Sequence, residues 1–125
     1  MAFDELKNPP TEPVDETDAT LGEVDLSKLD LPVQSWHLRL RRVDVGVGGI
    51  VPWHSHERRP AVLHILQGEI TEYSTANDAP VVRKAGDTIP EFGAVSHWWK
   101  NTGSEPVIIL AADVAEVESC TSGEC

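Results

Sequence analysis

Short runs of β-forming residues, each ended by turn-forming residues, limit what this chain can fold into. The runs fall at residues 36–45, 61–67, 70–74, 80–83, 94–99 and 106–114. Turn segments such as Ala85-Gly86-Asp87 and Asn101-Thr102-Gly103-Ser104 separate them. No long segment has a sustained helical period, and no internal repeat is evident. Many short strands with regular turns predict an all-β sandwich or barrel, and 125 residues are enough for one such domain.

The charged residues are distributed unevenly along the chain. Residues 1–31 carry nine acidic and two basic side chains, and residues 113–125 carry four acidic and no basic ones. The segment between them has eight of each sign, so the two ends account for the whole net charge of −11. Nucleic acids and anionic membranes both require a basic face on the protein. We therefore expect neither of them as a partner.

Composition also divides the chain into three parts. Residues 1–20 combine prolines and acids with few large apolar side chains, which predicts an extended or disordered acidic arm. Aliphatic residues recur from Leu21 to Leu31, and we expect this segment to pack against the domain or against a second subunit. The domain itself then covers residues 21–114, and residues 115–125 form a flexible acidic tail in which Cys120 and Cys125 have no assigned role. Because no apolar run is long enough to span a membrane and no signal peptide is visible, we expect a cytoplasmic protein.

Two histidines separated by one residue, His54 and His56, are the most informative chemical feature. On a β-strand, alternate side chains share a face, so both imidazoles would point the same way. A third histidine, His97, could complete a metal site with them if the sheet curls into a barrel.

The histidines belong to two longer patterns of residues. The first pattern consists of Gly48, His54, His56 and Gly68, and the second consists of Gly86, His97 and Asn101. These patterns resemble the two sequence motifs of the cupin family, and the resemblance covers about residues 36–114. It implies a small antiparallel jelly-roll barrel with one divalent transition metal in its mouth, held by His54, His56 and His97.

The chain departs from the family pattern at a few positions. The place where many cupins carry a glutamate ligand falls on Ala61, and Phe92 and Ala94 replace the usual proline and glycine of the second motif. Three neutral imidazoles would leave a divalent ion at a charge of +2, which favours an anionic or enolate-type ligand. Imidazole ligation suits several metals, so we favour Fe(II) and keep Zn, Ni, Cu and Mn as alternatives.

Strand parity predicts which other residues line the metal pocket. If Ala61 faces inward, then so do Leu63, Ile65 and Gln67, whereas His64 faces outward. Trp99 shares the parity of His97 and could form a pocket wall or simply fill the core. Arg59 and its neighbour Arg58, in the turn after the histidine pair, could hold a substrate carboxylate. We expect His64 and His37 to have structural roles.

Three functions remain open on this sequence. The first is a metal-dependent dioxygenase acting on a small anionic or chelating substrate, since three-histidine cupins that resemble this pattern include dioxygenases of thiols and β-diketones. The second is a non-oxidative isomerase or lyase, in which the ion acts as a Lewis acid. That chemistry requires a base, and none is obvious among the inward positions. The third is a non-enzymatic protein that binds a metal or a small molecule. In each case we expect a small-molecule ligand and a homodimer.

Overall fold

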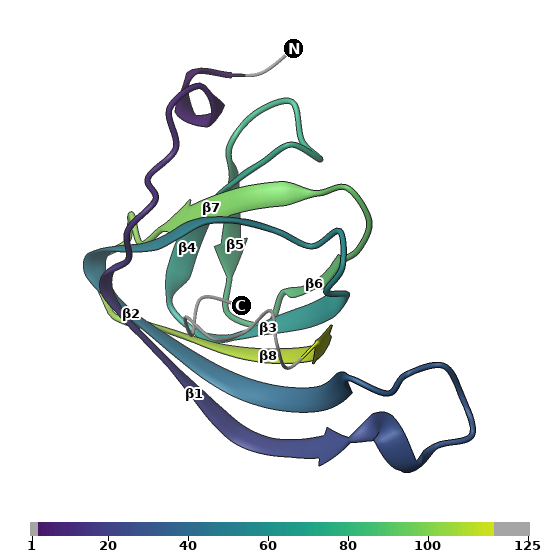
Figure 1. The fold of residues 1–125 in the computed structure, drawn as a ribbon. Helices are drawn as coiled ribbons and strands as arrows, with labels where there is room; N and C mark the ends of the chain where they lie inside the picture. The colour runs from purple at the N-terminus through teal and green to yellow at the C-terminus, as the bar shows by residue number, and fades with distance from the viewer. Residues whose placement is uncertain (1–2, 117–125) are drawn as a thin grey trace.

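The chain folds into antiparallel β-structure, as a computed structural model that describes residues 3–116 shows (Figure 1). The strands are β1 (Val14–Asp25), β2 (Trp36–Ser55), β3 (Ala61–Gln67), β4 (Glu69–Ser74), β5 (Val81–Lys84), β6 (Thr88–Glu91), β7 (Ser96–Lys100) and β8 (Val107–Glu116). Two single-turn helices, η1 (Asp4–Leu6) and η2 (Leu26–Lys28), accompany them. The predicted all-β jelly roll is confirmed. Among the described residues, no helix is both long enough and apolar enough to cross a membrane.

The long strand β2 connects the two halves of the barrel. Its first part pairs with β8 from Trp36↔Glu116 to Val45↔Val107, and its last part pairs with β7 between residues 50 and 55. The strand order is β5-β4-β7-β2-β8-β3-β6. The sheet therefore curls back on itself, so that β4, β5 and β7 face β8, β3 and β6 across the interior (Figure 1).

Glycines allow β2 to bend between its two pairing segments. Gly48 has φ of +77°, a conformation that side chains with a Cβ rarely adopt. A Cβ on Gly49 would lie 2.7 Å from the Val45 side chain and 2.9 Å from the Val14 carbonyl oxygen. Residues larger than glycine would therefore strain the bend. The bend directs the end of β2, which carries His54 and leads into His56, towards β7.

The interior is filled by the inward-facing side chains of β2, β3, β7 and β8. They alternate along each strand with outward-facing ones, so that Val43, Val45, Ile65, Trp99 and Ile109 are almost completely buried. Trp99, at 1% exposure, is the largest of these side chains. The period-two pattern thus positions both the apolar core and the polar residues that share its parity.

Strand β1 differs from the predicted acidic arm. It pairs with β2 over nearly its whole length, from Val14↔Ile50 to Asp25↔His37, so the boundary expected after residue 20 falls inside a strand. Residues before β1 also contact the barrel, because the Trp98 indole nitrogen donates to the carbonyl oxygen of Glu5 at 2.8 Å. Composition alone did not reveal these contacts, since most of them involve the backbone.

Most aliphatic side chains between Leu21 and Leu31 are not buried by the barrel, although the backbone of β1 pairs with β2 as far as Asp25. Leu21, Val24, Leu29 and Leu31 are each about half exposed, at 49–59%. Of the two placements expected for this segment, a second subunit is the one that would cover these side chains. The expected tail beyond Glu116, including both cysteines, lies outside the described residues.

Candidate metal centre

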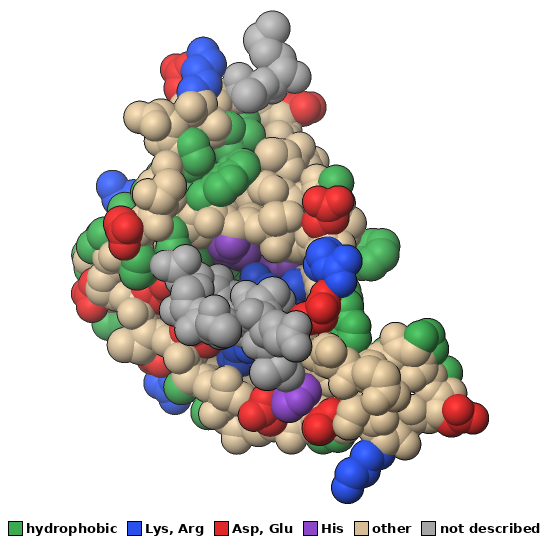
Figure 2. Space-filling view, in the orientation of Figure 1, with side chains coloured by type: hydrophobic (Ala, Val, Ile, Leu, Met, Phe, Trp, Pro, Cys, Tyr) green, Lys and Arg blue, Asp and Glu red, His purple; other side chains and the backbone are tan. Residues whose placement is uncertain are grey.

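Two adjacent strands bring the three histidines together. His54 lies near the end of β2 and His56 directly follows that strand, and His97 lies on β7 directly opposite His54 in the strand register. The Nε2 atom of His97 is 2.8 Å from Nε2 of His54 and 2.9 Å from Nε2 of His56. His56 and His97 are buried. Figure 2 shows histidine and basic side chains beside one another near the middle of this face.

The hydrogen bonds of the three rings determine where their protons lie. Each Nδ1 atom faces an acceptor 2.7–2.8 Å away, namely the carbonyl oxygens of Pro52 and Arg59 and the carboxylate of Glu72. A neutral imidazole has a single N–H group, so donation from Nδ1 leaves a lone pair on Nε2. Three lone pairs then converge with no proton between them, and a cation would satisfy all three.

The spacing of these atoms also fits a metal ion. Imidazole–metal bonds of about 2.0–2.1 Å place two ligand nitrogens at right angles about 3 Å apart. Both Nε2 distances, 2.8 and 2.9 Å, are close to that value. The group could therefore hold a metal ion with little rearrangement.

The electrostatic surroundings keep the three rings neutral. Burial lowers the pKa of His56 to about 4, helped by the neighbouring His97 and against the hydrogen bond to Arg59. Burial likewise moves the pKa of His54 well below its ordinary value and lowers the pKa of His97. Neutral imidazole is the form that binds metal, so the site is prepared for a cation at neutral pH.

A carboxylate group orients the His97 ring through its Nδ1 atom, on the side away from the other two histidines. Glu72 accepts from His97 Nδ1 at 2.7 Å and from Arg83 at 2.9 and 3.0 Å. Burial alone would raise the pKa of Glu72, but its hydrogen bond to His97 holds that pKa below the ordinary value. Burial and the charge of Glu72 raise the pKa of the adjacent Glu91 to about 9. Glu72 is thus the charged member of this pair at neutral pH, and it fixes the ring that it contacts.

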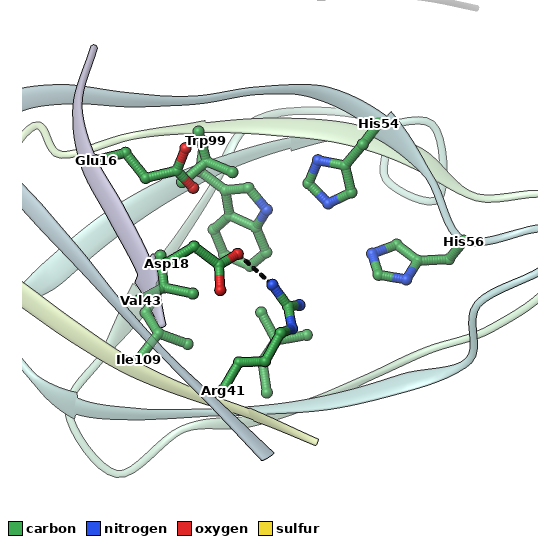
Figure 3. A pocket seen from close by; sticks show the side chains of 10 residues that line it. Glu16, Asp18, Arg41, Val43, His54, His56, Trp99 and Ile109 are labelled. Atoms are coloured by element: carbon green, nitrogen blue, oxygen red, sulfur yellow. Dashed lines mark hydrogen bonds and ion pairs between the residues drawn. The ribbon is translucent and has the colours of Figure 1, made fainter. Parts of the chain in front are cut away.

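A small cavity of about 40 Å³ opens beside the histidines, with room for only a few water molecules (Figure 3). Its apolar walls are Val43, Val51, Leu63, Trp99 and Ile109. Its polar lining consists of Glu16, Asp18, Arg41, His54 and His56. In Figure 3 the two carboxylates reach in from β1 on one side, and the histidines stand on the other. Charged groups of both signs therefore meet in this pocket.

The structure places some of the predicted pocket residues beside this cavity and others elsewhere. Leu63 and Trp99 line the cavity, and Trp99 also packs edge-on against His97 with ring centroids 5.1 Å apart. Ile65 is completely buried in the core instead. Gln67 does not face inward. A register shift in the β3–β8 pairing after Ile65 breaks the alternation, and Gln67 is exposed and donates to the Pro106 carbonyl.

Arg59 and Arg58 do not reach the cavity. The buried Arg59 guanidinium donates to Asp113 at 2.9 Å, and the exposed Arg58 pairs with Glu116. The other histidines have structural contacts, as expected: His64 Nδ1 is 2.8 Å from the Thr88 hydroxyl and His37 Nδ1 is 3.0 Å from Glu23.

Ala61 faces inward, as its strand parity predicts, but it lies away from the cavity beside the histidines. It is buried in the core and does not line the cavity. Its register partners are Glu91 on β6 and Asp113 on β8, so two acidic side chains share its face of the sheet. Acidic groups near the centre therefore come from strands β1, β4 and β6 instead of position 61.

Sequence reasoning missed four polar groups, namely Glu16, Asp18, Arg41 and Glu72. Parity could have found Arg41, because it shares a strand face with Val43 and Val45. It could not have singled out Glu72, because β4 is buried on both faces. Glu16 and Asp18 were assigned to the acidic arm, and no pattern in that segment distinguishes a paired strand from a solvated one.

Comparisons with known proteins agree with this architecture. Residues 41–113 match a family model described as the cupin domain. An oxalate-binding protein from Thermotoga maritima is 32% identical over 93 residues, which are 72% of this chain and 74% of that protein. The auxin-binding protein ABP19b of Prunus persica is 36% identical over 74 residues, 57% of this chain and 35% of that protein. The chain thus spans about a third of the length of the plant relative.

A solved structure supports the fold independently. A predicted oxalate decarboxylase from Thermotoga maritima superposes with a TM-score of 0.61 at 22% identity, and the match covers 91% of this chain and 98% of that one. At this level of identity the likeness concerns the arrangement of the strands.

Proposed function

The chain belongs to the cupin family, and from this premise we propose that it binds one divalent transition metal through His54, His56 and His97. The observation that carries the proposal is the convergence of three unprotonated Nε2 atoms, each kept unprotonated by an acceptor on its Nδ1 side. The imidazoles bind the ion in their neutral form, and Glu72 holds His97 in position. Fe(II) is our first choice among the metals that suit such ligands.

The activity that we propose is that of a dioxygenase acting on a small anionic or chelating substrate. A redox-active ion would supply electrons for oxygen chemistry, whereas zinc could act only as a Lewis acid. The chain itself supplies a cavity whose apolar walls, Trp99 and Leu63 among them, limit water, and whose size restricts it to small ligands. One relative is named for binding oxalate, a small chelating dianion, which agrees with this substrate class.

An isomerase or lyase is the second candidate, and the carboxylates of β1 favour it. Glu16 and Asp18 line the same cavity as the histidines and could accept or return a proton. The sequence alone had provided no such base. A protein that only binds a metal or a small molecule is the third candidate.

Metal analysis of histidine variants tests the proposed ligands. We expect about one metal ion per purified wild-type chain, and near none in His56→Ala and His97→Ala. The matched controls are His37→Ala and His64→Ala, which remove half-buried imidazoles outside the group and should keep the metal. A His97→Ala protein that binds one ion with unchanged affinity would contradict the assignment.

Oxygen uptake then separates the three functions. Fe(II)-loaded protein should consume oxygen with at least one small acid, thiol or diketone, and Zn(II)-loaded protein should be inactive with the same compound. Turnover that survives zinc substitution and needs no oxygen would replace the dioxygenase with the isomerase or lyase. If the protein binds such a compound but does not turn it over with any metal, the third candidate, a non-enzymatic binding protein, is the one that stands.

A further inference from the structure

Arg41 is a buried cation inside the candidate site. Its side chain is 8% exposed, and it lines the same cavity as His54 and His56 (Figure 3). A guanidinium stays charged at any pH of interest, so in a buried position it needs an anion beside it. The identity of that anion determines what the cavity can accept.

Asp18 is the anion that pairs most directly with Arg41. The Asp18 carboxylate, on the adjacent strand β1, accepts from Arg41 Nη1 (Figure 3). The other nearby carboxylate, Asp113, lies 3.3 Å from Arg41 Nε, yet among the described residues this buried nitrogen makes no hydrogen bond. Asp113 already accepts from Arg39 at 2.7 and 2.8 Å and from Arg59 at 2.9 Å. Arg41 therefore depends on Asp18 for its hydrogen-bonded partner.

The pairing uses only part of what the guanidinium offers. Arg41 has five N–H donors in a planar fork, which matches a carboxylate through two parallel hydrogen bonds. Asp18 occupies Nη1. The buried position also disfavours the charged form of Asp18, because burial raises its pKa, although the charge of Arg41 opposes that effect. A second carboxylate that entered the cavity would compete with Asp18 for the same donors.

The size of the cavity makes this competition direct. The cavity that Arg41, Asp18 and the histidines line measures only about 40 Å³, so a carboxylic acid that entered it would come into direct contact with the Asp18 carboxylate. The segment that carries Asp18 lies between two irregularities in the β1–β2 register, at Val14/Glu16 and at Thr20/Gly22.

We propose that Arg41 binds the carboxylate of a small carboxylic acid beside the histidine group, and that Asp18 is a built-in competitor that lowers the affinity for it. This inference rests on the proposed function, because it places the ligand of the metal site between the histidines and Arg41. It also replaces Arg59, whose guanidinium is bonded to Asp113, as the anchor for a substrate carboxylate.

The chain contains a matched control for this pair. Arg42 and Asp44, also on β2, form a two-fold hydrogen-bonded ion pair at 2.9 and 3.0 Å. Both side chains are more than 40% exposed and neither lines the cavity. Replacing Asp44 by asparagine therefore removes the same charge from the same kind of pair without changing the site.

The test is calorimetric titration of the full-length, zinc-loaded protein with oxalate at pH 7. Asp18→Asn keeps the shape of the side chain and removes its charge, so we expect it to raise oxalate affinity roughly tenfold. Arg41→Gln should lower the affinity by a similar factor, and Arg41→Lys, which keeps the charge but loses the fork, should lie between Arg41→Gln and the wild type. Asp44→Asn should leave the affinity within about twofold of the wild type.

The double variant Asp18→Asn/Arg41→Gln shows whether the two residues act together. If Asp18 competes through Arg41, removing its charge gains little once Arg41 is absent, so the two effects will not add. Unchanged or weaker oxalate binding in Asp18→Asn would overturn the inference, as would a gain of equal size in both backgrounds. If Arg41→Gln does not fold, Asp18→Asn and Arg41→Lys still decide the question.

Measuring the metal content of every variant separates two kinds of failure. If the wild type retains no metal, the proposed function fails, whatever the effect of Asp18. If all variants hold one ion and bind oxalate with equal affinity, the metal site stands and the role of Asp18 and Arg41 is excluded.

Discussion

Asp113 is the anion on which the buried arginines of the barrel converge. It is fully buried and accepts hydrogen bonds from Arg39 and Arg59. Burial alone would raise the pKa of Asp113, but the hydrogen bond from Arg39 and the charge of Arg41 hold that pKa below its ordinary value of 3.8. The carboxylate therefore stabilises the fold through its charge.

We predict that Asp113→Asn lowers the free energy of unfolding by about 3–5 kcal/mol at pH 7, because it leaves buried guanidinium groups without their common partner. Urea titration measures this free energy of unfolding.

The pKa of Asp113 is lower in the folded protein than in the unfolded chain. The stabilisation by the Asp113 charge is therefore complete above the unfolded pKa and is lost as the pH falls through the folded pKa. The deficit of the variant should thus shrink below about pH 4. Asp44→Asn, in the exposed Arg42–Asp44 pair, should lower the free energy of unfolding by less than about 1 kcal/mol. An equal loss in both variants would contradict a stabilising role for the buried charge of Asp113.

The predictability of single residues depends on whether strand parity holds. His54 and His56 share a face, as alternation predicts, because the irregularity in the β2–β7 pairing lies before both of them, between Val51 and His54. Leu63 lies in the regular part of the β3–β8 pairing. Gln67 does not, because a register shift after Ile65 comes from the pairing of β3 with β8, which is not visible in β3 itself. The prediction that Arg59 binds substrate fails to anticipate its contact with Asp113, which is distant along the chain but lies 2.9 Å away in the fold.

Among the elements, β1 is the one that the sequence misjudged most. Its acids and the prolines before it are typical of a solvated arm, but backbone pairing with β2 holds it in the sheet, and Asp18 meets Arg41 inside the barrel. Strand β3, in contrast, has the bounds predicted for it, residues 61–67, because aliphatic residues fill it and turns end it. Local composition therefore located most of the core strands but missed the edge strand β1 and the short strand β6 (Thr88–Glu91).

Two truncations measure the contribution of β1. Deleting residues 2–18 removes the first part of the strand together with Asp18, and we expect the melting temperature to fall by several degrees, although composition alone predicts no effect. Deleting residues 2–12 keeps β1 whole and loses only contacts such as the one between Trp98 and Glu5, so its effect should be smaller. Thermal unfolding followed by circular dichroism gives both values. Identical melting temperatures for the wild type and the longer deletion would mean that β1 adds nothing to stability.

The outer surface of the whole molecule has an apolar side that the barrel leaves exposed. Leu38 and Leu40 on β2 point outward at 45% and 42% exposure, and Leu21, Val24, Leu29 and Leu31 of the neighbouring hairpin are more exposed still. Val24 is the register partner of Leu38, so the side chains of these two residues lie close together on adjacent strands. Contiguous exposed apolar side chains are typical of an interaction surface. A second copy of the chain, which we propose as the partner, would bury the aliphatic side chains that its own barrel leaves exposed.

A charged substitution on this surface tests the homodimer. Light scattering should give the wild type about twice the chain mass of 13.7 kDa, and Leu40→Asp should give a single chain, because an aspartate there would be buried without a partner in the dimer. The matched control is Val82→Asp on β5, at the opposite edge of the sheet, where valine is 48% exposed. It adds the same charge outside the apolar side and should leave the mass unchanged. A wild-type protein that stays monomeric at high concentration, or a Leu40→Asp variant that remains dimeric, would show that this side of the barrel is not the subunit interface.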